Sequence, residues 1–414
     1  MSPYSISSAA TAGHRPQALP RVNLAALAAA LALLAVGTWY LGASVGTKQA
    51  ALYLVGAALG ATLYHSAFGF TSSWRVFIAD GRGAGLRAQM LMLAVACALF
   101  FPALAGGTLF GAPVHGFVSP IGVSVVVGAF LFGTGMQLGG GCASGTLYTV
   151  GGGSTRMIVT LAGFVAGSLL GSAHLPWWSA QPHIAPVSLV KELGATGALA
   201  LNLVVFAAIA GVTVLVERKR HGRLVTKPTS AVAGWPRWLH GPWPLVAGAV
   251  LLAGLNFATL ALAGRPWGVT SAFALWGAKI AGGLGFDVAS WPYWQAAGNK
   301  AALAAPISAD ITSVMDVGVI IGALATAALA GKFAPVWKLP LKSLFAAIVG
   351  GVLLGYGARL AFGCNIGAYF SGIASGSLHG WLWLVAAFAG NVLGTRLRPL
   401  FDLPVEREPR ETAC

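Results

Sequence analysis

The chain has 414 residues, of which 57% are hydrophobic and only 8% are charged. Because soluble domains carry about 25% charged residues, this composition excludes a soluble fold and predicts an all-α membrane protein that crosses the bilayer many times. The net charge of +15 does not indicate nucleic-acid binding, because the basic residues lie between apolar runs and not on one face.

Ten apolar stretches are long enough to cross a hydrocarbon core about 30 Å thick at about 1.5 Å per residue. In chain order they are 23–43, 50–69, 86–106, 117–139, 157–175, 195–216, 244–264, 311–331, 343–361 and 381–395. Glycine, proline and Lys279 interrupt the apolar segment 267–303, so we expect broken, short or re-entrant helices there. Residues 1–22 and 396–414 are predicted cytoplasmic tails, 176–194 an external loop and 218–240 a basic cytoplasmic loop.

The distribution of basic residues predicts the orientation of these spans. With the N-terminus in the cytoplasm, 19 of the 25 basic residues fall on the cytoplasmic side. They are Arg15, Arg21, Arg75, Arg82, Arg87, Arg156, Arg218, Lys219, Arg220, Arg223, Lys227, Arg237, Lys332, Lys338, Lys342, Arg396, Arg398, Arg407 and Arg410. The positive-inside rule therefore predicts a multi-pass protein of the cell inner membrane with both termini in the cytoplasm.

Two glycine-rich segments, 133–145 and 355–367, indicate an internal duplication. They align without gaps at an offset of 222 (364 minus 142) and share the pattern G-x-G-x-x-x-[GA]-x-G-C-x-x-G. The copies, 23–175 and 195–395, contain five spans each, and an odd number gives them opposite orientations. By the order of the spans, 66–68 (S-A-F) of the first copy faces 271–273 (S-A-F) of the second. Inverted repeats are typical of secondary transporters; a miscounted span would make the repeats parallel.

The four cysteines are Cys97, Cys142, Cys364 and Cys414. Cys97 is interpreted as a small buried apolar residue, and Cys414 has no assigned role. No C-x-x-C motif indicates a zinc site or a disulfide-exchange enzyme, and we expect neither metal nor cofactor. The two remaining thiols lie in matching turns, where glycines let backbone N–H groups approach an anion, or where both are simply small residues in tight packing. The flanking glycines are Gly141, Gly145, Gly363 and Gly367.

The stretch 133–146 (G-T-G-M-Q-L-G-G-G-C-A-S-G-T) and the weaker copy F-G-C-N-I-G at 362–367 resemble the signature of the YeeE/YedE family of sulfur-transport membrane proteins. The resemblance implies an hourglass fold of inverted halves around a narrow path, with Cys142 and Cys364 as path thiols. The thiosulfate-type pattern has a third cysteine in the first half, which the stretch 66–74 lacks. Thr71, Ser72 or Ser73 would supply a hydroxyl there instead.

Charged residues inside the apolar regions are further candidates. Arg359 lies opposite Gln137 of the first copy, and its guanidinium would either attract an anion or snorkel to the interface or pair with an acid. Asp316 is a candidate for that acid or for a proton-coupling group. Lys279 is either a cation at an anion entrance or an interfacial lysine.

These features favour a permease or channel for a small inorganic sulfur-containing anion such as thiosulfate, and not an enzyme. Thiols contact the soft sulfur weakly while N–H groups hold the oxygens, and several weak contacts in series suit conduction. The alternatives are transport of a selenium compound or another sulfur species, a membrane thiol enzyme or sulfur carrier, and a structural subunit. The expected partners are the lipid bilayer and a small cytoplasmic sulfur-handling protein, without nucleic acid; the oligomeric state is open.

Overall fold

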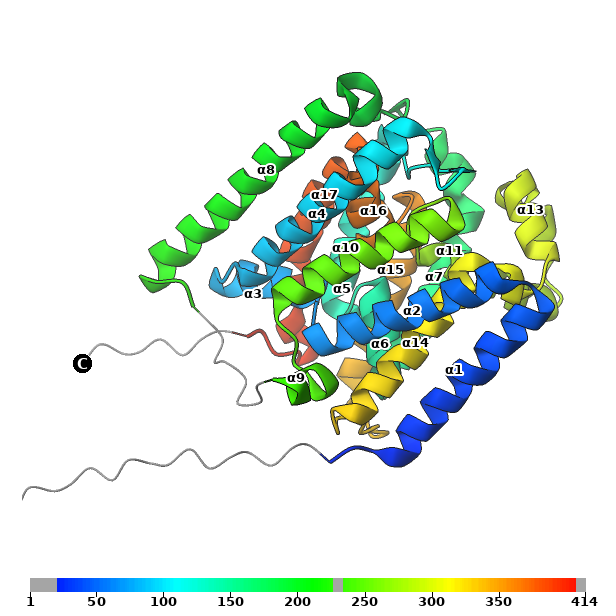
Figure 1. Cartoon of the computed structure of the whole chain (residues 1–414), viewed down its shortest axis with the longest axis horizontal. Coiled ribbons are helices and arrows are strands. Elements are labelled where there is room, and N and C mark those ends of the chain that lie inside the picture. Colours follow the sequence, from blue (N-terminus) through cyan, green and yellow to red (C-terminus); the bar gives the residue numbers. More distant parts are fainter. Residues whose placement is uncertain (1–20, 226–233, 407–414) are drawn as a thin grey trace, which may run out of the picture.

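The computed structural model describes residues 21–225 and 234–406, and these are almost entirely helical (Figure 1). The first half contains α1 (Leu24–Ser44), α2 (Thr47–Ser66), α3 (Phe70–Asp80), α4 (Ala84–Gly106), α5 (Val123–Gly139), α6 (Ala143–Gly151) and α7 (Thr155–Ser179). The second half contains α8 (Leu189–His221), α9 (Trp235–His240), α10 (Leu245–Ala263), α11 (Thr270–Gly283), α12 (Pro292–Gln295), α13 (Ala297–Ala304), α14 (Ile311–Leu329), α15 (Leu341–Leu360), α16 (Ser371–Ala374) and α17 (Leu378–Leu397).

Short elements complete the chain. The 3-10 turns are η1 (Val288–Ser290), η2 (Ile307–Ala309) and η4 (Arg398–Phe401), and η3 (Asn365–Phe370) is one stretch of π-helix. Strand β1 (Thr108–Leu109) pairs with β2 (Ala112–Pro113), and β3 (Ile121–Gly122) pairs with β4 (His183–Ile184), both antiparallel. The all-α prediction is therefore confirmed.

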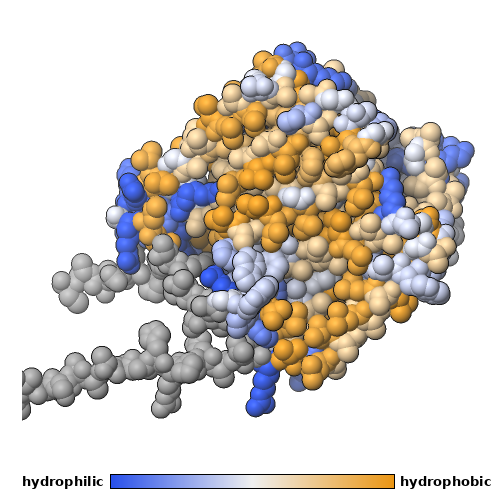
Figure 2. Space-filling model, in the orientation of Figure 1, coloured by the Kyte–Doolittle hydropathy of each residue, from blue (hydrophilic) through white to orange (hydrophobic). Residues whose placement is uncertain are grey.

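Nine helical stretches among the described residues have the length and hydropathy of a membrane span. The tenth expected span is present as the 20-residue helix α17. Helices α1 and α8 are the least buried of the candidate spans and lie on the outside of the molecule (Figure 1). Figure 2 shows hydrophobic residues spread over the middle of the visible face and hydrophilic residues toward its edges, as a lipid-facing belt requires.

Three local expectations differ from the structure. The first concerns α5, which starts at Val123 and not at 117, because Pro120 keeps the preceding residues extended. The second concerns α8, which starts before 195 and contains a kink at Gly194 (φ 69°). The third concerns the match of 66–68 with 271–273, which is wrong: Ser66 ends α2, whereas Ser271 is the second residue of α11. The second residue of the equivalent helix α3 is Thr71.

The two copies of the repeat are inverted. Helices α5 and α15 carry the duplicated motif and pack against each other. The Ser124 hydroxyl, at the start of α5, donates to the Leu360 carbonyl at the end of α15 (2.6 Å). Because the start of one helix meets the end of the other, the equivalent helices run antiparallel. The packing also exchanges between halves: α7 packs on α15, and its equivalent α17 packs on α5.

Glycines on these helices let the two halves approach to backbone contact. A Cβ on Gly133 of α5 would lie 2.0 Å from the Ala387 carbonyl oxygen of α17. A Cβ on the equivalent Gly355 of α15 would lie 2.1 Å from the Phe164 carbonyl oxygen of α7. Both positions therefore require glycine, as expected where membrane helices pack closely.

The loops gather into two groups at opposite ends of the bundle. Contacts such as Arg220 with the Ala79 carbonyl and His240 with the Leu329 carbonyl join the loops near 80, 140, 220–225, 234–240, 330–342 and 400–406, which we call the basic end. The opposite end holds the loops near 107–122, 180–188, 264–269 and 284–310. Arg15, Lys227, Arg407, Arg410 and Cys414 lie outside the described residues. That the basic end faces the cytoplasm stays a prediction.

Candidate functional site

The first thiol lies in a tight turn between α5 and α6. Gly140 takes the left-handed conformation that ends α5 (φ 92°), which glycine adopts without steric cost. Cys142 then caps α6, and its Sγ accepts the Gly145 N–H at 3.4 Å. The Ser144 hydroxyl lies 3.5 Å from the same sulfur. The turn therefore presents one thiol together with N–H and O–H groups.

The second thiol repeats this arrangement after α15. Phe362 and Gly363 both have positive φ (54° and 151°), which reverses the chain. Cys364 caps η3, and its Sγ accepts the Ile366 N–H at 3.4 Å. The π-helical geometry of η3 differs from the α-helical α6, so the duplication preserves the thiol and its N–H contact but not the helix type.

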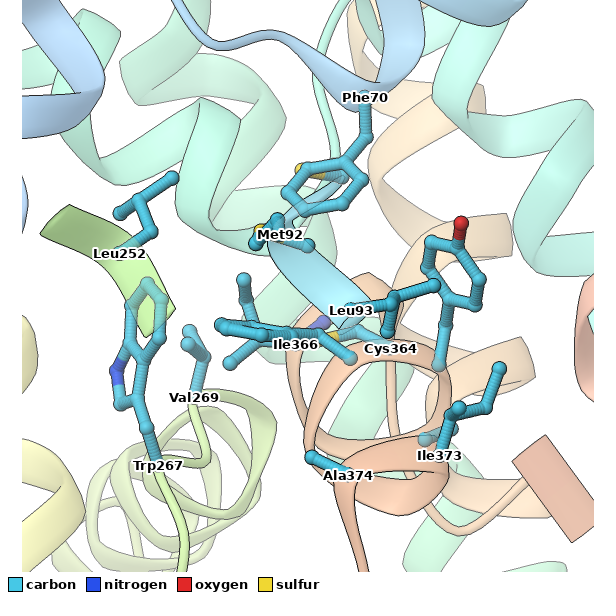
Figure 3. Packing of buried hydrophobic residues seen from close by; sticks show 14 of the residues in the cluster. Phe70, Met92, Leu93, Leu252, Trp267, Val269, Cys364, Ile366, Ile373 and Ala374 are labelled. Carbon is cyan, nitrogen blue, oxygen red and sulfur yellow. The ribbon is translucent and has the colours of Figure 1, made fainter. Parts of the chain in front are cut away.

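The two thiol turns converge in the core. Helices α6 and η3 contact each other, and the two thiols belong to one buried cluster, with exposures of 2% for Cys142 and 0% for Cys364. Figure 3 shows Cys364 beside Ile366 and Leu93, with Val269 and Trp267 nearby. Full crossing of both motif helices would have separated the thiols by the thickness of the membrane; the glycine turns instead bring them together in apolar surroundings.

A cavity of about 410 Å³ reaches the second thiol turn from the opposite end. Two guanidinium groups, Arg265 and Arg359, line it, and the glycines on either side of Cys364, Gly363 and Gly367, form part of its wall. A Cβ on Gly367 would meet no atom within 4 Å. The cavity is therefore a positively charged vestibule that ends at the glycines of the second turn.

Arg359 points to this vestibule and is 9% exposed. Its Nη1 donates to the Tyr293 hydroxyl (2.7 Å), and its Nε has no partner among the described residues. Among the alternatives left open for Arg359, pairing with Asp316 is therefore not the arrangement in the described residues, where its partner is Tyr293. Lys279 does not line the cavity; its ammonium donates to the Leu303 and Ala305 carbonyls (2.8 Å each) and so fastens the broken region.

Arg265 is the second cation of the vestibule, and sequence reasoning did not assign it a role. Its Nη2 donates to the Thr312 hydroxyl (3.0 Å), and the Asp310 and Asp316 carboxylates act on it electrostatically. Asp316 is fully buried, and neither of its oxygens has a hydrogen-bond partner in the described part of the chain. In the sequence, Arg265 follows directly after the end of α10. It was therefore visible only as a basic residue at the end of a span, and nothing else in the sequence indicated a role in the site.

Asn365 is a second residue that sequence reasoning missed. It follows Cys364 directly and is 0% exposed, yet neither polar atom of its side chain has a partner within 21–225 and 234–406. A buried amide without partners is costly, and a ligand beside the thiol would supply them. The signal in the sequence was its position: it directly follows the cysteine of the duplicated motif, where the two copies carry different residues.

Thr71 is the candidate for the hydroxyl that replaces a third cysteine. Its hydroxyl is buried and has no partner among the described residues, while its carbonyl accepts the Gln137 side-chain N–H (3.2 Å). By contrast, the Ser72 hydroxyl donates to the Gly69 carbonyl, and Ser73 packs against Gly85. Of the three hydroxyls, that of Thr71 is the one that is buried and has no partner in the described part of the chain, which favours it as a ligand contact.

The model of the sulphur transport family matches residues 65–393, which include both thiol turns and the vestibule arginines. The chain belongs to the sulphur transport family. This confirms the resemblance to YeeE/YedE proteins. The chain is 30% identical over 173 residues to the "Probable transporter YedE" of Escherichia coli (strain K12), covering 41% of this chain and 42% of that protein. The corresponding YedE of Salmonella typhimurium is 33% identical over 174 residues, with the same coverage.

A third relative matches a longer region. The "Thiosulfate transporter TsuA" of Spirochaeta thermophila is 31% identical over 280 residues, covering 65% of this chain and 76% of that protein. The match with the YedE proteins spans about two fifths of their length. The family membership together with the candidate spans makes the chain a multi-pass membrane protein of a sulfur-transport family.

Proposed function

We propose that the chain is a permease or channel of the inner membrane for a small sulfur-containing anion, which passes the two thiols without forming a covalent bond. The observation that carries this proposal is that two thiol turns meet in the core while a vestibule with two guanidinium groups ends at one of them. Charge selects an anion, and a buried thiol suits a soft atom, so together they favour a substrate with negative oxygens and a terminal sulfur.

The passage follows from the order of these groups. The guanidinium groups of Arg265 and Arg359 attract the anion into the vestibule and replace part of its hydration shell. Open space beside Gly367 lets it reach Cys364, where the Asn365 amide offers a donor. The terminal sulfur then accepts weak S–H hydrogen bonds from Cys364 and Cys142 in turn, and the Thr71 hydroxyl follows toward the basic end. Each contact is weak enough to release the ion.

Thiosulfate is the proposed substrate, because it combines oxygens with a terminal sulfur and because one relative is named a thiosulfate transporter. The threonine at the third position makes a selenium compound or another sulfur species the alternative. We place both termini in the cytoplasm, where a small sulfur-handling protein would receive the ion. The sequence contains no C-x-x-C pair of cysteines, so we propose that the protein is not an enzyme.

Uptake of labelled thiosulfate into cells without their own sulfur importers tests the proposal. We expect Cys142→Ala and Cys364→Ala each to reduce uptake at least tenfold, because each removes one contact in a series. Cys97→Ala is the matched control: its thiol is also buried but donates to the Ile373 carbonyl (3.7 Å) and lies outside both turns. Equal amounts of protein in the membrane must be verified by immunoblot.

Two outcomes would overturn parts of the proposal. Uptake by both alanine variants at the parental rate would show that the thiols are not on the path. A stable persulfide on either cysteine during turnover, detected by mass spectrometry of the intact protein, would favour a covalent sulfur carrier. Stronger competition by selenite than by unlabelled thiosulfate would move the substrate to the selenium class.

A further inference from the structure

A cluster of three arginines surrounds the end of α5 at the basic end, on the far side of the thiols from the vestibule. Arg75 of α3 and Arg156 of α7 both act electrostatically on Arg398 of η4. Arg156 donates to the Leu138 and Gly139 carbonyls (2.6 Å each). Arg398 donates to the Gln137 carbonyl (2.6 Å). These two guanidinium groups are therefore committed to the exposed backbone carbonyls at the end of a helix.

Arg75 differs from its neighbours in the kind of partner it has. Within residues 21–225 and 234–406, its guanidinium donates to side chains only: Nη1 to the Gln137 amide oxygen (3.4 Å), and Nε and Nη2 to the two carboxylate oxygens of Glu406 (2.6 and 2.5 Å). Its side chain is 9% exposed, whereas that of Glu406 is 48% exposed. The buried guanidinium of Arg75 is therefore paired with a half-exposed carboxylate at the protein surface.

The segment 398–406 carries this anion to the cluster, and we call it the C-terminal strap. Arg398 fixes the strap, because its Nε and Nη2 donate to the Pro404 carbonyl (3.0 and 2.8 Å). The pair of Arg75 with Glu406 consists of two N–H···O bonds from one guanidinium to two oxygens. Arginine binds two oxygens of a tetrahedral oxyanion with the same geometry. The Glu406 carboxylate therefore has the charge and the two-oxygen geometry of such an anion.

The position of Arg75 connects this pair with the path. Gln137, which accepts from Arg75, donates to the Thr71 carbonyl (3.2 Å), and Gln137 lies on α5 five residues before Cys142. An anion that has passed the thiols and Thr71 would meet Arg75 next. We propose that Arg75 is an anion-binding site at the basic end of the path, and that the Glu406 carboxylate occupies it as a tethered competitor which the transported anion displaces.

This inference rests on the proposed function, but its test measures binding, not transport. Purified protein in lipid nanodiscs is titrated with thiosulfate and, separately, with sulfate by calorimetry. We expect Glu406→Gln to bind both anions about tenfold more tightly than the parent chain, because a neutral amide competes poorly for the guanidinium. Sulfate should gain as much as thiosulfate, since Arg75 recognises oxygens and not the soft sulfur.

Asp402→Asn is the matched control on the same strap, because the Asp402 carboxylate pairs with Lys342 (3.0 Å) and not with the cluster. It should bind as the parent does. The double variant Arg75→Gln/Glu406→Gln should lose the gain. If Glu406→Gln does not fold, a chain ended after Val405 replaces it.

Parental affinity in both Glu406→Gln and the shortened chain would overturn the inference, and so would a gain that survives Arg75→Gln. Failure of the proposed function has a different signature: thiosulfate would not be taken up by the parent chain, while the gain in anion binding on neutralising Glu406 would remain.

Discussion

The two ends of the thiol path use arginine in different ways. At the opposite end, Arg265 and Arg359 line an open vestibule, and their described partners are the hydroxyls of Thr312 and Tyr293. At the basic end, Arg156 and Arg398 are bound to backbone carbonyls and Arg75 to a carboxylate. In the described part of the chain, neither vestibule guanidinium donates to a carboxylate, although Asp310 and Asp316 act on Arg265 electrostatically, so both can still donate to an anion, whereas a guanidinium that binds helix carbonyls supports the fold. The structure therefore combines an accessible end with an end closed by the protein's own acceptors.

The largest effect should follow from removing the charge of the vestibule. We expect the double variant Arg265→Gln/Arg359→Gln to raise the KM for thiosulfate about thirtyfold or more, since two unit charges that each contribute about 1–3 kcal/mol to binding an anion together contribute about 2–6 kcal/mol. Uptake rates measured over a range of thiosulfate concentrations check this. Added salt should weaken parental binding and affect the double variant less.

Arg156→Gln serves as the comparison at the basic end. It should lower the midpoint of thermal unfolding in detergent, because the Leu138 and Gly139 carbonyls each lose one hydrogen-bond donor. Losing a donor to a buried carbonyl costs about 1–3 kcal/mol of stability. Its KM should change little. If Arg156→Gln raised KM as strongly as the vestibule variant, the contrast between the two ends would be wrong.

A smaller effect should follow from filling the open space beside the second thiol turn. We expect Gly367→Val to reduce uptake several-fold without loss of stability, because a Cβ there meets no atom within 4 Å and occupies the vestibule. Gly254→Val on α10, where a Cβ also meets no atom within 4 Å, is the matched control and should transport normally. Normal uptake by Gly367→Val would place the path elsewhere.

The smallest effect is expected from pH at the basic end. The hydrogen bond from Arg75 holds the pKa of Glu406 below its usual value of 4.5. A lowered pKa means that the strap is stabilised fully above about pH 4.5 and released only as pH falls through the lowered value. Anion binding in nanodiscs should therefore not change between pH 8 and 6 on account of Glu406. A change in this range that Glu406→Gln abolishes would contradict this assignment.

Much of the fold followed from hydropathy and from the repeat. Nine of the ten expected spans meet the criteria for a span, and the interrupted segment after α10 is broken into α11, α12 and α13. The register of the motif was correct because cysteine and glycine allow few alternatives there. The match of Ser66 with Ser271 has an offset of 205 (271 minus 66), whereas the equivalent helix positions Thr71 and Ser271 differ by 200 (271 minus 71). The offset rises to 222 at the thiols, so the copies differ in length between these points and the motif could not fix the match here.

The site was predicted less completely than the fold. The thiols and Arg359 were found from a motif and from a charge in an apolar run, but neither gives the direction in which a side chain opens to a cavity. Arg265 lies 94 residues before Arg359 (359 minus 265), so only the packing of α10, α11 and α15 brings the two together. Glu406 is an ordinary acid in a polar tail, and its contact with Arg75 depends on where the strap ends.

The backbone contacts at Gly133 and Gly355 limit how this molecule can work. Because α5 touches α17 and α7 touches α15 without intervening side chains, each half is interlocked with the other at two symmetry-related places. A large rocking movement would have to separate peptide groups already in contact on both sides at once. We therefore expect the halves to stay together during passage, with the gate confined to rearrangements of a few residues at the thiol turns and the strap.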